Sequence, residues 1–373
     1  NIENKNVDKK VIKKSWKKRI VKYLFLLLLL LFLSIGSFLV LLPKFEFLQK
    51  QLASKLVYFL DDLFIADLQV GKINFKSYDN IQIDDILVYT KGDTLAYIPK
   101  IKLEFGLRQL FLNNVYVKKL QIYNSKFKLL RLKDSTWNYE YIVESSSEDT
   151  SSSKTPFLNL KNIELINCTF RFLDSTKDNK IIDNQLNYSN LWLNKINFKA
   201  DAELDIDKKI HYYYLQKLSF NEVNTGLVVN SLNADKISFL KDKSIVENMN
   251  LVVNNSKIKV EAEANGFSPI NFNYEDLFTM KSNTKISSQN FNTKNLYFFA
   301  DSIVKFPRDY EVDFVANGNL SSAIVNDIHI KGKGINLKGS CIVKDYTDPD
   351  KLSYNANVAN SNIDIFEVKK VLV

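Results

Sequence analysis

The spacing of apolar residues changes twice along the chain. The segment YLFLLLLLLFLSIGSFLVLLP is apolar over the nineteen residues from Leu24 to Leu42, apart from Ser34, Gly36 and Ser37. At about 1.5 Å per helical residue this run approaches the roughly 30 Å hydrocarbon core of a bilayer. We therefore predict a transmembrane helix over residues 23–43. Its membrane-anchoring side chains would be Leu24, Phe25, Leu28, Leu31, Phe32, Ile35, Leu39 and Leu42.

Residues 1–22 form a basic tail before this run, with nine Lys and Arg against two acidic residues. Under the positive-inside rule this tail lies in the cytoplasm, and everything after Pro43 lies on the far side of the membrane. The topology-setting residues nearest the membrane would be Lys17, Lys18, Arg19 and Lys22. The alternative is a cleaved signal peptide, but the run is longer than a typical apolar core and LLPKFEFLQ offers no small-residue cleavage site.

Residues 44–64 carry apolar residues at steps of three and four, which predicts an amphipathic helix. The repeating positions are Phe45, Leu48, Leu52, Leu56, Phe59, Leu60 and Leu63. Such a helix could pack on the structure that follows it. It could equally plug the membrane end of that structure or lie on the bilayer surface. Both interpretations stay open.

From residue 65 to residue 373 the period is two, as in IPKIKLEF, where Ile101, Leu103 and Phe105 alternate with charged residues. Alternation rich in Tyr, Phe, Ile, Val and Thr predicts β-strands with one apolar face. The run ESSSEDTSSSKTP, residues 144–156, is too polar to bury a core and predicts a flexible loop. The chain ends within a strand-like pattern, so we expect it to be the N-terminal portion of a longer protein.

One ten-residue pattern recurs four times within this region. LQIYNSKFKL (120–129), IELINCTFRF (163–172), LWLNKINFKA (191–200) and LVVNNSKIKV (251–260) all have apolar residues at positions 1, 3, 8 and 10. The change of parity between positions 3 and 8 would flip side chains to the other face unless a turn or bulge intervenes. We therefore interpret the polar centre as a joint, with Cys168 as a small turn residue in one copy.

If the joint restores the facing, the apolar positions of all four copies line one side of the sheet. The candidate lining residues are Leu120, Ile122, Phe127, Leu129, Ile163, Leu165, Phe170, Phe172, Leu191, Leu193, Phe198, Leu251, Val253, Ile258 and Val260. The spacings between copies are unequal, which argues against a fixed-period solenoid and favours a meander.

Charge and chemistry exclude several functions. Beyond residue 22 the chain has 42 basic and 40 acidic residues, so no basic face for nucleic acid is indicated. His211 and His329 have no metal-spaced partner, and the G-x-G of KGKGINLKGS (331–340) precedes no helix pattern, so a hairpin is expected there. Cys168 and Cys341 could form a disulfide, but their spacing does not establish one. We expect no catalytic residue, metal or cofactor.

A sheet with one apolar face must cover it, and no long amphipathic helix is predicted after residue 64. The sheet should therefore curl on itself. If it curls into an open trough, the continuous apolar interior suits acyl chains. Alternatively, side chains fill the interior completely.

The order of these features resembles the TamB branch of the AsmA-like proteins. The basic flank, the Leu run and LQKQLASKLVYFLDDLFIADLQVGKINF are similar to that family's opening. GDTLAYIPKIKLEF and LNNVYVKKLQIYNSKFKLLRLKDSTWNYEYI resemble its next hallmark. FNTKNLYFFADSI and VANGNLSSAIVNDIHIKGKGINLKGSCIVKDY resemble its later strands.

The resemblance implies a bacterial inner-membrane protein with one cytoplasmic-to-periplasmic pass and an elongated, curled, antiparallel-type β-groove, called a β-taco. It implies transfer of phospholipids toward the outer membrane, with an Omp85-type outer-membrane barrel as partner through a C-terminal region not recognisable here. The alternative is a scaffold that assists assembly or secretion of outer-membrane β-barrel proteins by strand addition. A third possibility, an envelope enzyme with its site outside this sequence, has no support in the residues.

Overall fold

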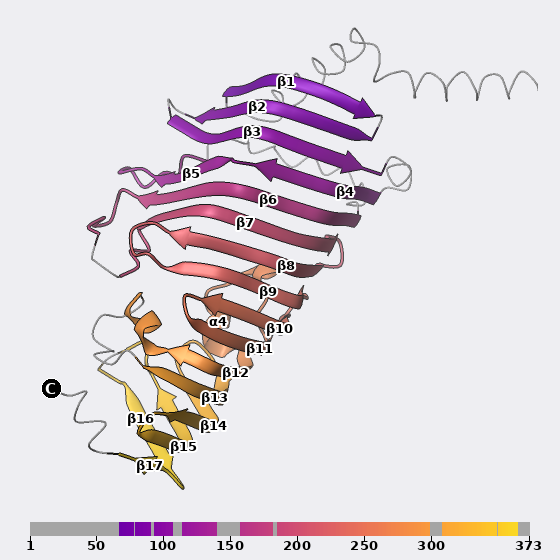
Figure 1. Ribbon diagram of the computed structural model, residues 1–373. Helices are drawn as coiled ribbons and strands as arrows, with labels where there is room; N and C mark the ends of the chain where they lie inside the picture. Colours follow the sequence, from indigo (N-terminus) through magenta and orange to yellow (C-terminus); the bar gives the residue numbers. More distant parts are fainter. Residues whose placement is uncertain are drawn as a thin grey trace, which may run out of the picture.

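In the part of the chain that the structure describes, alternating apolar and polar residues build seventeen strands, which form one sheet. The structure is a computed structural model, and it describes residues 67–77, 79–90, 93–106, 114–139, 157–181, 185–298, 308–348 and 350–364. Figure 1 shows the strands stacked in chain order from β1 at one end to β17 at the other. The expectation of a mainly β chain is therefore confirmed.

The first strands are β1 (Asp67–Ser77), β2 (Asn80–Thr90), β3 (Asp93–Phe105), β4 (Asn114–Tyr123), β5 (Lys126–Arg131) and β6 (Phe157–Asp174). The central strands are β7 (Asn190–Asp205), β8 (Ile210–Glu222), β9 (Val228–Phe239), β10 (Lys243–Val253) and β11 (Ser256–Asn265). The last strands are β12 (Lys281–Asn292), β13 (Asp309–Gly318), β14 (Ala323–Gly332), β15 (Ile335–Lys344), β16 (Ser353–Val358) and β17 (Asn362–Ile363). The helical elements of the described residues are η2 (Pro269–Asn271), α4 (Asp276–Thr279) and η3 (Thr293–Phe298).

The sheet is antiparallel with one exception. β4 and β5 lie end to end, and both pair antiparallel with β3 on one side. On the other side both pair parallel with β6. A parallel pair needs a crossover connection rather than a hairpin. The connection between β5 and β6 includes the predicted loop 144–156, which lies outside the described residues. The sheet is thus mostly antiparallel, and the prediction missed this parallel step.

A line of irregular residues crosses the strands near their middle. Asp85, Asn124, Asn167 and Lys195 all have φ between 51° and 56°, the left-handed region. Asn167 Nδ2 donates to Asn124 Oδ1 at 2.9 Å, so these two joints are neighbours on adjacent strands. Pro99 lies opposite Asp85 on β3, where its missing N–H fits an interruption of the ladder. We call this line the crease.

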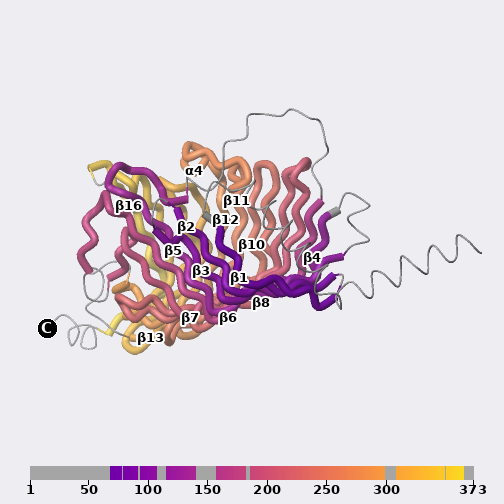
Figure 2. Tube along the Cα trace, turned by 90° about the horizontal axis from the view of Figure 1, so that it is seen from above, coloured from indigo at the N-terminus to yellow at the C-terminus, as the bar shows by residue number. Residues whose placement is uncertain are grey.

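The crease faces inward. Ser125 and Cys168 follow its left-handed residues and are 0 % exposed, although each lies only two residues before a partly exposed Phe. The residues that directly follow Asp85 and Lys195, Ile86 and Ile196, are also buried, at 8 % and 9 % exposed, so the whole line beside the crease is enclosed. Figure 2 shows the result from above, with the sheet curving round rather than lying flat. We call the concave face the trough.

The polar centre of the repeat is a joint, as predicted, but of two kinds. In the first copy it is the short break between β4 and β5, and in the second and third copies it is an irregularity within β6 and β7, all at the crease. In the fourth copy it is a two-residue hairpin turn, Asn254-Asn255, between β10 and β11. The G-x-G of residues 331–340 is also a hairpin, because Gly332 pairs with Ile335 and Gly334 has φ 78°.

Several predictions fall outside the described residues. These are the basic tail 1–22 with Lys17, Lys18, Arg19 and Lys22, the transmembrane helix 23–43, and the amphipathic helix 44–64. Within the part of the chain that is described, no helix is long and apolar enough to cross a bilayer.

Because Cys168 is fully buried at the crease, we expect that position 168 does not accept a larger side chain. Replacing Cys168 by Leu adds volume to a fully buried joint and should lower the free energy of unfolding by about 1–3 kcal/mol. Cys168→Ser should be nearly neutral, because two other copies of the repeat have Ser there. Cys341→Leu is the matched control, since Cys341 is only partly buried. Urea unfolding of the full chain in detergent, monitored by circular dichroism, is the measurement. If both Leu variants unfolded at the same urea concentration, the joint at Cys168 would not be tightly packed.

Candidate functional site: the apolar trough

Ten apolar residues run across the sheet in a single line, one on each strand from β1 to β11 except β5. Each is the direct cross-strand partner of the next, so all ten point to the same face. We call them the apolar row. They are Ile73, Ile83, Ile101, Ile122, Leu165, Phe198, Leu218, Leu232, Leu251 and Ile258.

The row is long and partly open. Nine steps between strands at roughly 4.8 Å each give about 43 Å, which exceeds the roughly 30 Å of a bilayer core. All ten side chains are half-buried, and none is in the fully buried core. A partly accessible apolar surface of this length makes the row a candidate binding surface. The trough is thus not completely filled by its own side chains.

A second line of cross-strand partners runs beside the apolar row and extends the trough to β16. From Phe105 on β3 it passes through Leu160, Tyr213 and Val246 to Val325 on β14, again by direct cross-strand pairing. From β11 onward its members include Ala262, Thr284, Ala316 and Cys341. The trough therefore becomes less apolar toward β16.

The opposite face of the same strands is polar. Gln121, Glu164 and Lys199 are direct neighbours on β4, β6 and β7. Glu164 accepts from Gln121 Nε2 at 2.6 Å and pairs with Lys199 Nζ at 2.9 Å. These bonds, the one from Gln121 first, lower the pKa of the Glu164 carboxyl from its usual value. These charged and hydrogen-bonded side chains make this face of β4, β6 and β7 polar, whereas the apolar row lies on the other face.

The structure brings the sequence-predicted lining residues together. Leu120, Ile122, Phe127 and Leu129 pair in register with Ile163, Leu165, Phe170 and Phe172, as the alignment of the copies implies. On the other side of β6, Phe198, Leu193 and Leu191 pair with Leu165, Phe170 and Phe172. In the fourth copy Leu251 pairs with Ile258, while Val253 and Val260 lie on the same face. Of these residues, only Val253 is fully buried.

Sequence reasoning missed five members of the row: Ile73, Ile83, Ile101, Leu218 and Leu232. They lie outside the recurring ten-residue pattern, so comparison of the copies could not find them. Simple alternation around Ile101 in IPKIKLEF was a usable signal, but it does not say which strand lies beside which.

The trough is covered over β7–β11 by η3. Phe298 of η3 joins Leu227, Val229 and Val253 in a buried cluster. Leu186 donates its backbone N–H to the carbonyl oxygen of Phe298 at 2.8 Å, so the chain before β7 is held to η3. Beneath this cover lies a cavity of about 360 Å³.

Asn295 fastens the cover to the hairpin of the fourth repeat. Its Oδ1 accepts from Asn254 Nδ2 at 3.0 Å, and its Nδ2 donates to Ser256 Oγ at 2.6 Å and to the Val253 carbonyl at 3.3 Å. Asn295 is 6 % exposed and Ser256 is 0 % exposed. The polar centre of this copy is therefore both a turn and an attachment point for η3.

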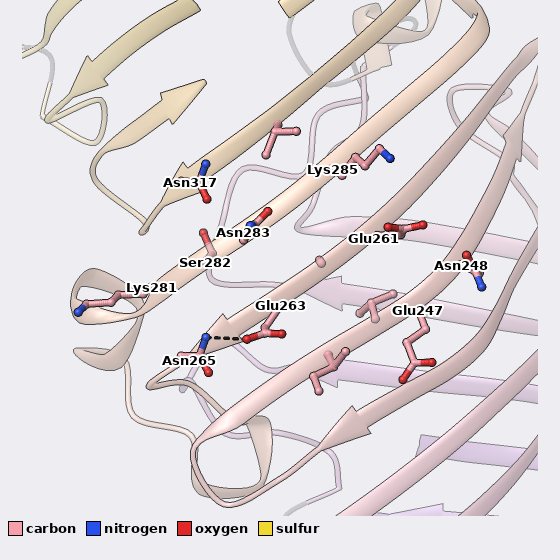
Figure 3. A pocket seen from close by; sticks show the side chains of 14 residues that line it. Glu247, Asn248, Glu261, Glu263, Asn265, Lys281, Ser282, Asn283, Lys285 and Asn317 are labelled. Carbon is pink, nitrogen blue, oxygen red and sulfur yellow. Dashed lines mark hydrogen bonds between the residues drawn. The ribbon is translucent and has the colours of Figure 1, made fainter. Parts of the chain in front are cut away.

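A larger, polar hollow of about 820 Å³ lies along β10–β13 and is shown in Figure 3. Its labelled side chains include Glu247, Glu261, Glu263, Lys281 and Lys285, which lie along neighbouring strands. By cross-strand pairing, Glu263 and Glu261 belong to the face opposite the trough. Glu263 pairs with Lys243 at 2.7 Å, so the hollow is a solvated charged surface.

The described residues hold no arrangement typical of catalysis. They contain no group of three or more His, Cys, Asp or Glu residues placed to bind a metal. His211 lies against Tyr213 on β8, and burial lowers the pKa of its imidazole. His329 on β14 lies within 3.2 Å of Asn336. Cys168 and Cys341 are free thiols. What the geometry offers is burial of apolar groups, at about 0.8 kcal/mol per CH₂.

Comparison with known proteins identifies no family or relative: no family model, curated protein or solved structure matches this chain.

Replacing Asn295 by Ala tests the attachment of η3. The change leaves the buried Ser256 hydroxyl and the Asn254 amide without this partner and should cost about 1–3 kcal/mol of stability. Hydrogen exchange of residues 293–298 should accelerate in Asn295→Ala and stay unchanged in Lys294→Ala, because Lys294 is exposed. Equal exchange rates in the two variants would show that Asn295 does not hold the cover.

Proposed function

We propose that the trough carries phospholipids by their acyl chains, without enzymatic chemistry. The observation that supports this most directly is the apolar row, continuous over ten strands and half-buried throughout. An acyl chain lying on the row replaces water against Ile and Leu side chains, at about 0.8 kcal/mol per CH₂. Adjacent positions along the row are chemically alike, so an acyl chain that moves from one position to the next loses and gains similar contacts.

The proposal places the headgroup at the open side of the trough. The row itself offers no polar side chain, so the lipid tail alone is recognised on it. Transport of this kind selects for acyl chains and discriminates weakly between headgroups. It also requires no cofactor.

The setting of this transport comes from the sequence. The predicted anchor over residues 23–43 and the basic tail before it support a single-pass inner-membrane protein with its bulk in the periplasm. The resemblance to the TamB family supports a β-taco that bridges toward the outer membrane, in outer-membrane biogenesis. An Omp85-type barrel would then be the partner at the far end, engaged through a C-terminal region.

The second candidate is a scaffold for outer-membrane β-barrel proteins, and the strand β16 favours it. Every residue of Ser353–Val358 is exposed, and among the described residues β16 pairs only with β15. An exposed strand edge can accept a further strand from a client protein. On this view lipid would bind the trough incidentally or not at all.

A photo-crosslinking amino acid at position 170 separates the two candidates. Phe170 faces the trough, whereas Thr169 pairs with Lys126 on the polar face. After ultraviolet illumination of a Gram-negative bacterium that expresses the full chain, mass spectrometry should find phospholipid adducts at position 170 and only background at position 169. Absence of lipid at position 170, together with adducts to barrel proteins at Tyr354 of β16, would replace the conduit by the scaffold.

Introducing charge into the trough should block the path. Phe170→Glu and Ile122→Glu place a carboxylate among apolar side chains, where an acyl chain would have to desolvate it. A penalty of about 1.4 kcal/mol already lowers occupancy tenfold. With the crosslinker at Ile101, lipid adducts should therefore fall about tenfold or more in either variant. Thr169→Glu is the matched control, and an equal fall there would mean that the added charge acts through folding rather than through the trough.

A further inference from the structure

The cavity under η3 differs from the rest of the trough because it is covered. Its walls come from the six strands β7 to β12, from the chain before β7, from the turn before β9 and from η3. The lining includes Leu191 and Leu193 of β7, Leu251 of β10, Ile258 of β11 and Leu296 of η3. Leu251 and Ile258 are also the last two members of the apolar row. The row therefore leads directly into the cavity.

The two buried polar residues of the lining, Glu222 and Asn295, have their polar atoms bound within the protein. Glu222 is 2 % exposed, and its carboxylate accepts from the Trp192 backbone N–H at 3.2 Å and from the Thr225 N–H and hydroxyl at 2.7 Å each. Asn295 is committed to the β10–β11 hairpin. A polar ligand would find no free partner here, so the occupant must be apolar where it touches the wall.

The shape of the cavity limits the occupant further. Its volume of about 360 Å³ is near the lower end of ligand pockets, which span roughly 300–1,000 Å³. Tyr188 also lines the cavity and is 62 % exposed, so it marks the opening to solvent. A slender apolar group can enter along the row while its polar end stays outside.

We propose that this cavity is a discrete binding site for one acyl chain, in which a lipid tail leaves the open row and is enclosed by η3. The site rests on the proposed function, because its occupant arrives along the same row. It goes further in giving the trough a defined stopping point at β7–β11. Because η3 adds a wall opposite the strands, the cavity buries more of the acyl chain than the open row does, so the lipid stays there longer.

A long-chain fatty acid with a diazirine at its terminal carbon is the probe. The full chain, reconstituted in vesicles, is incubated with the probe, illuminated and digested, and the labelled residues are mapped by mass spectrometry. We expect adducts at Leu227, Val229 and Leu296, which enclose the cavity. Leu251→Trp fills the cavity and should remove these adducts at least about tenfold, while adducts at Ile83 and Ile101 remain.

Val252→Trp is the matched control, because Val252 pairs with Lys257 and Ser231 on the polar face, beside Leu251. It should leave the cavity adducts unchanged. If circular dichroism shows that Leu251→Trp does not fold, the smaller change Leu193→Phe narrows the same cavity and should reduce the adducts in the same direction.

The outcomes separate this site from the conduit. Adducts along Ile83 and Ile101 but none at the cavity would overturn the site and leave the conduit standing. If Leu251→Trp folds and still gives as many cavity adducts as Val252→Trp, the site is also overturned, because the probe would then label these residues from outside the cavity. Adducts at neither place would remove both proposals.

Discussion

Among the described residues, the sheet has one apolar face and no second layer covers it, and the rest of the described structure depends on this constraint. The described strands carry polar side chains on one face and the apolar row on the other, and their helical elements are too short to form a layer. The crease relieves part of this constraint. Left-handed residues at Asn124, Asn167 and Lys195 bend successive strands at the same level, so the sheet curves toward its apolar side. The curve shelters the row without closing over it.

The small residues at the crease follow from the same constraint. Where the bend is tightest, side chains on the inner side converge, and Ser125 and Cys168 are fully buried there. Away from the bend the walls separate, and large residues such as Phe127 and Phe170 stay half-buried. A buried line between two half-buried apolar walls is the geometry of a trough, and its most buried members, Ser125 and Cys168, are small. In an ordinary core the largest side chains would be the most buried.

The recurring ten-residue pattern corresponds to one apolar wall, the buried joint and the second apolar wall of the trough. Its apolar positions 1, 3, 8 and 10 are symmetric about the joint, so reversing the direction of a copy leaves apolar residues at the same four positions. This symmetry explains why copies fit side by side in the parallel pair of β4/β5 with β6 and in the antiparallel pair of β6 with β7. The fourth copy uses the same positions around a hairpin, and there Asn254 and Ser256 hold η3. One pattern thus supports both the open row and the covered cavity.

Much of this could be read from the sequence. Alternation predicted the strands, the parity change predicted the joints, and the four copies predicted fifteen lining residues that the structure places on one face. These features are local, because side-chain facing along a strand follows from a period of two. The sequence could not reveal the parallel step at β6, the alignment of the joints into a crease or the cover formed by η3. These depend on which strands lie side by side and on contacts such as Asn295 with Ser256, far apart in the chain, and only the tertiary structure brings them together.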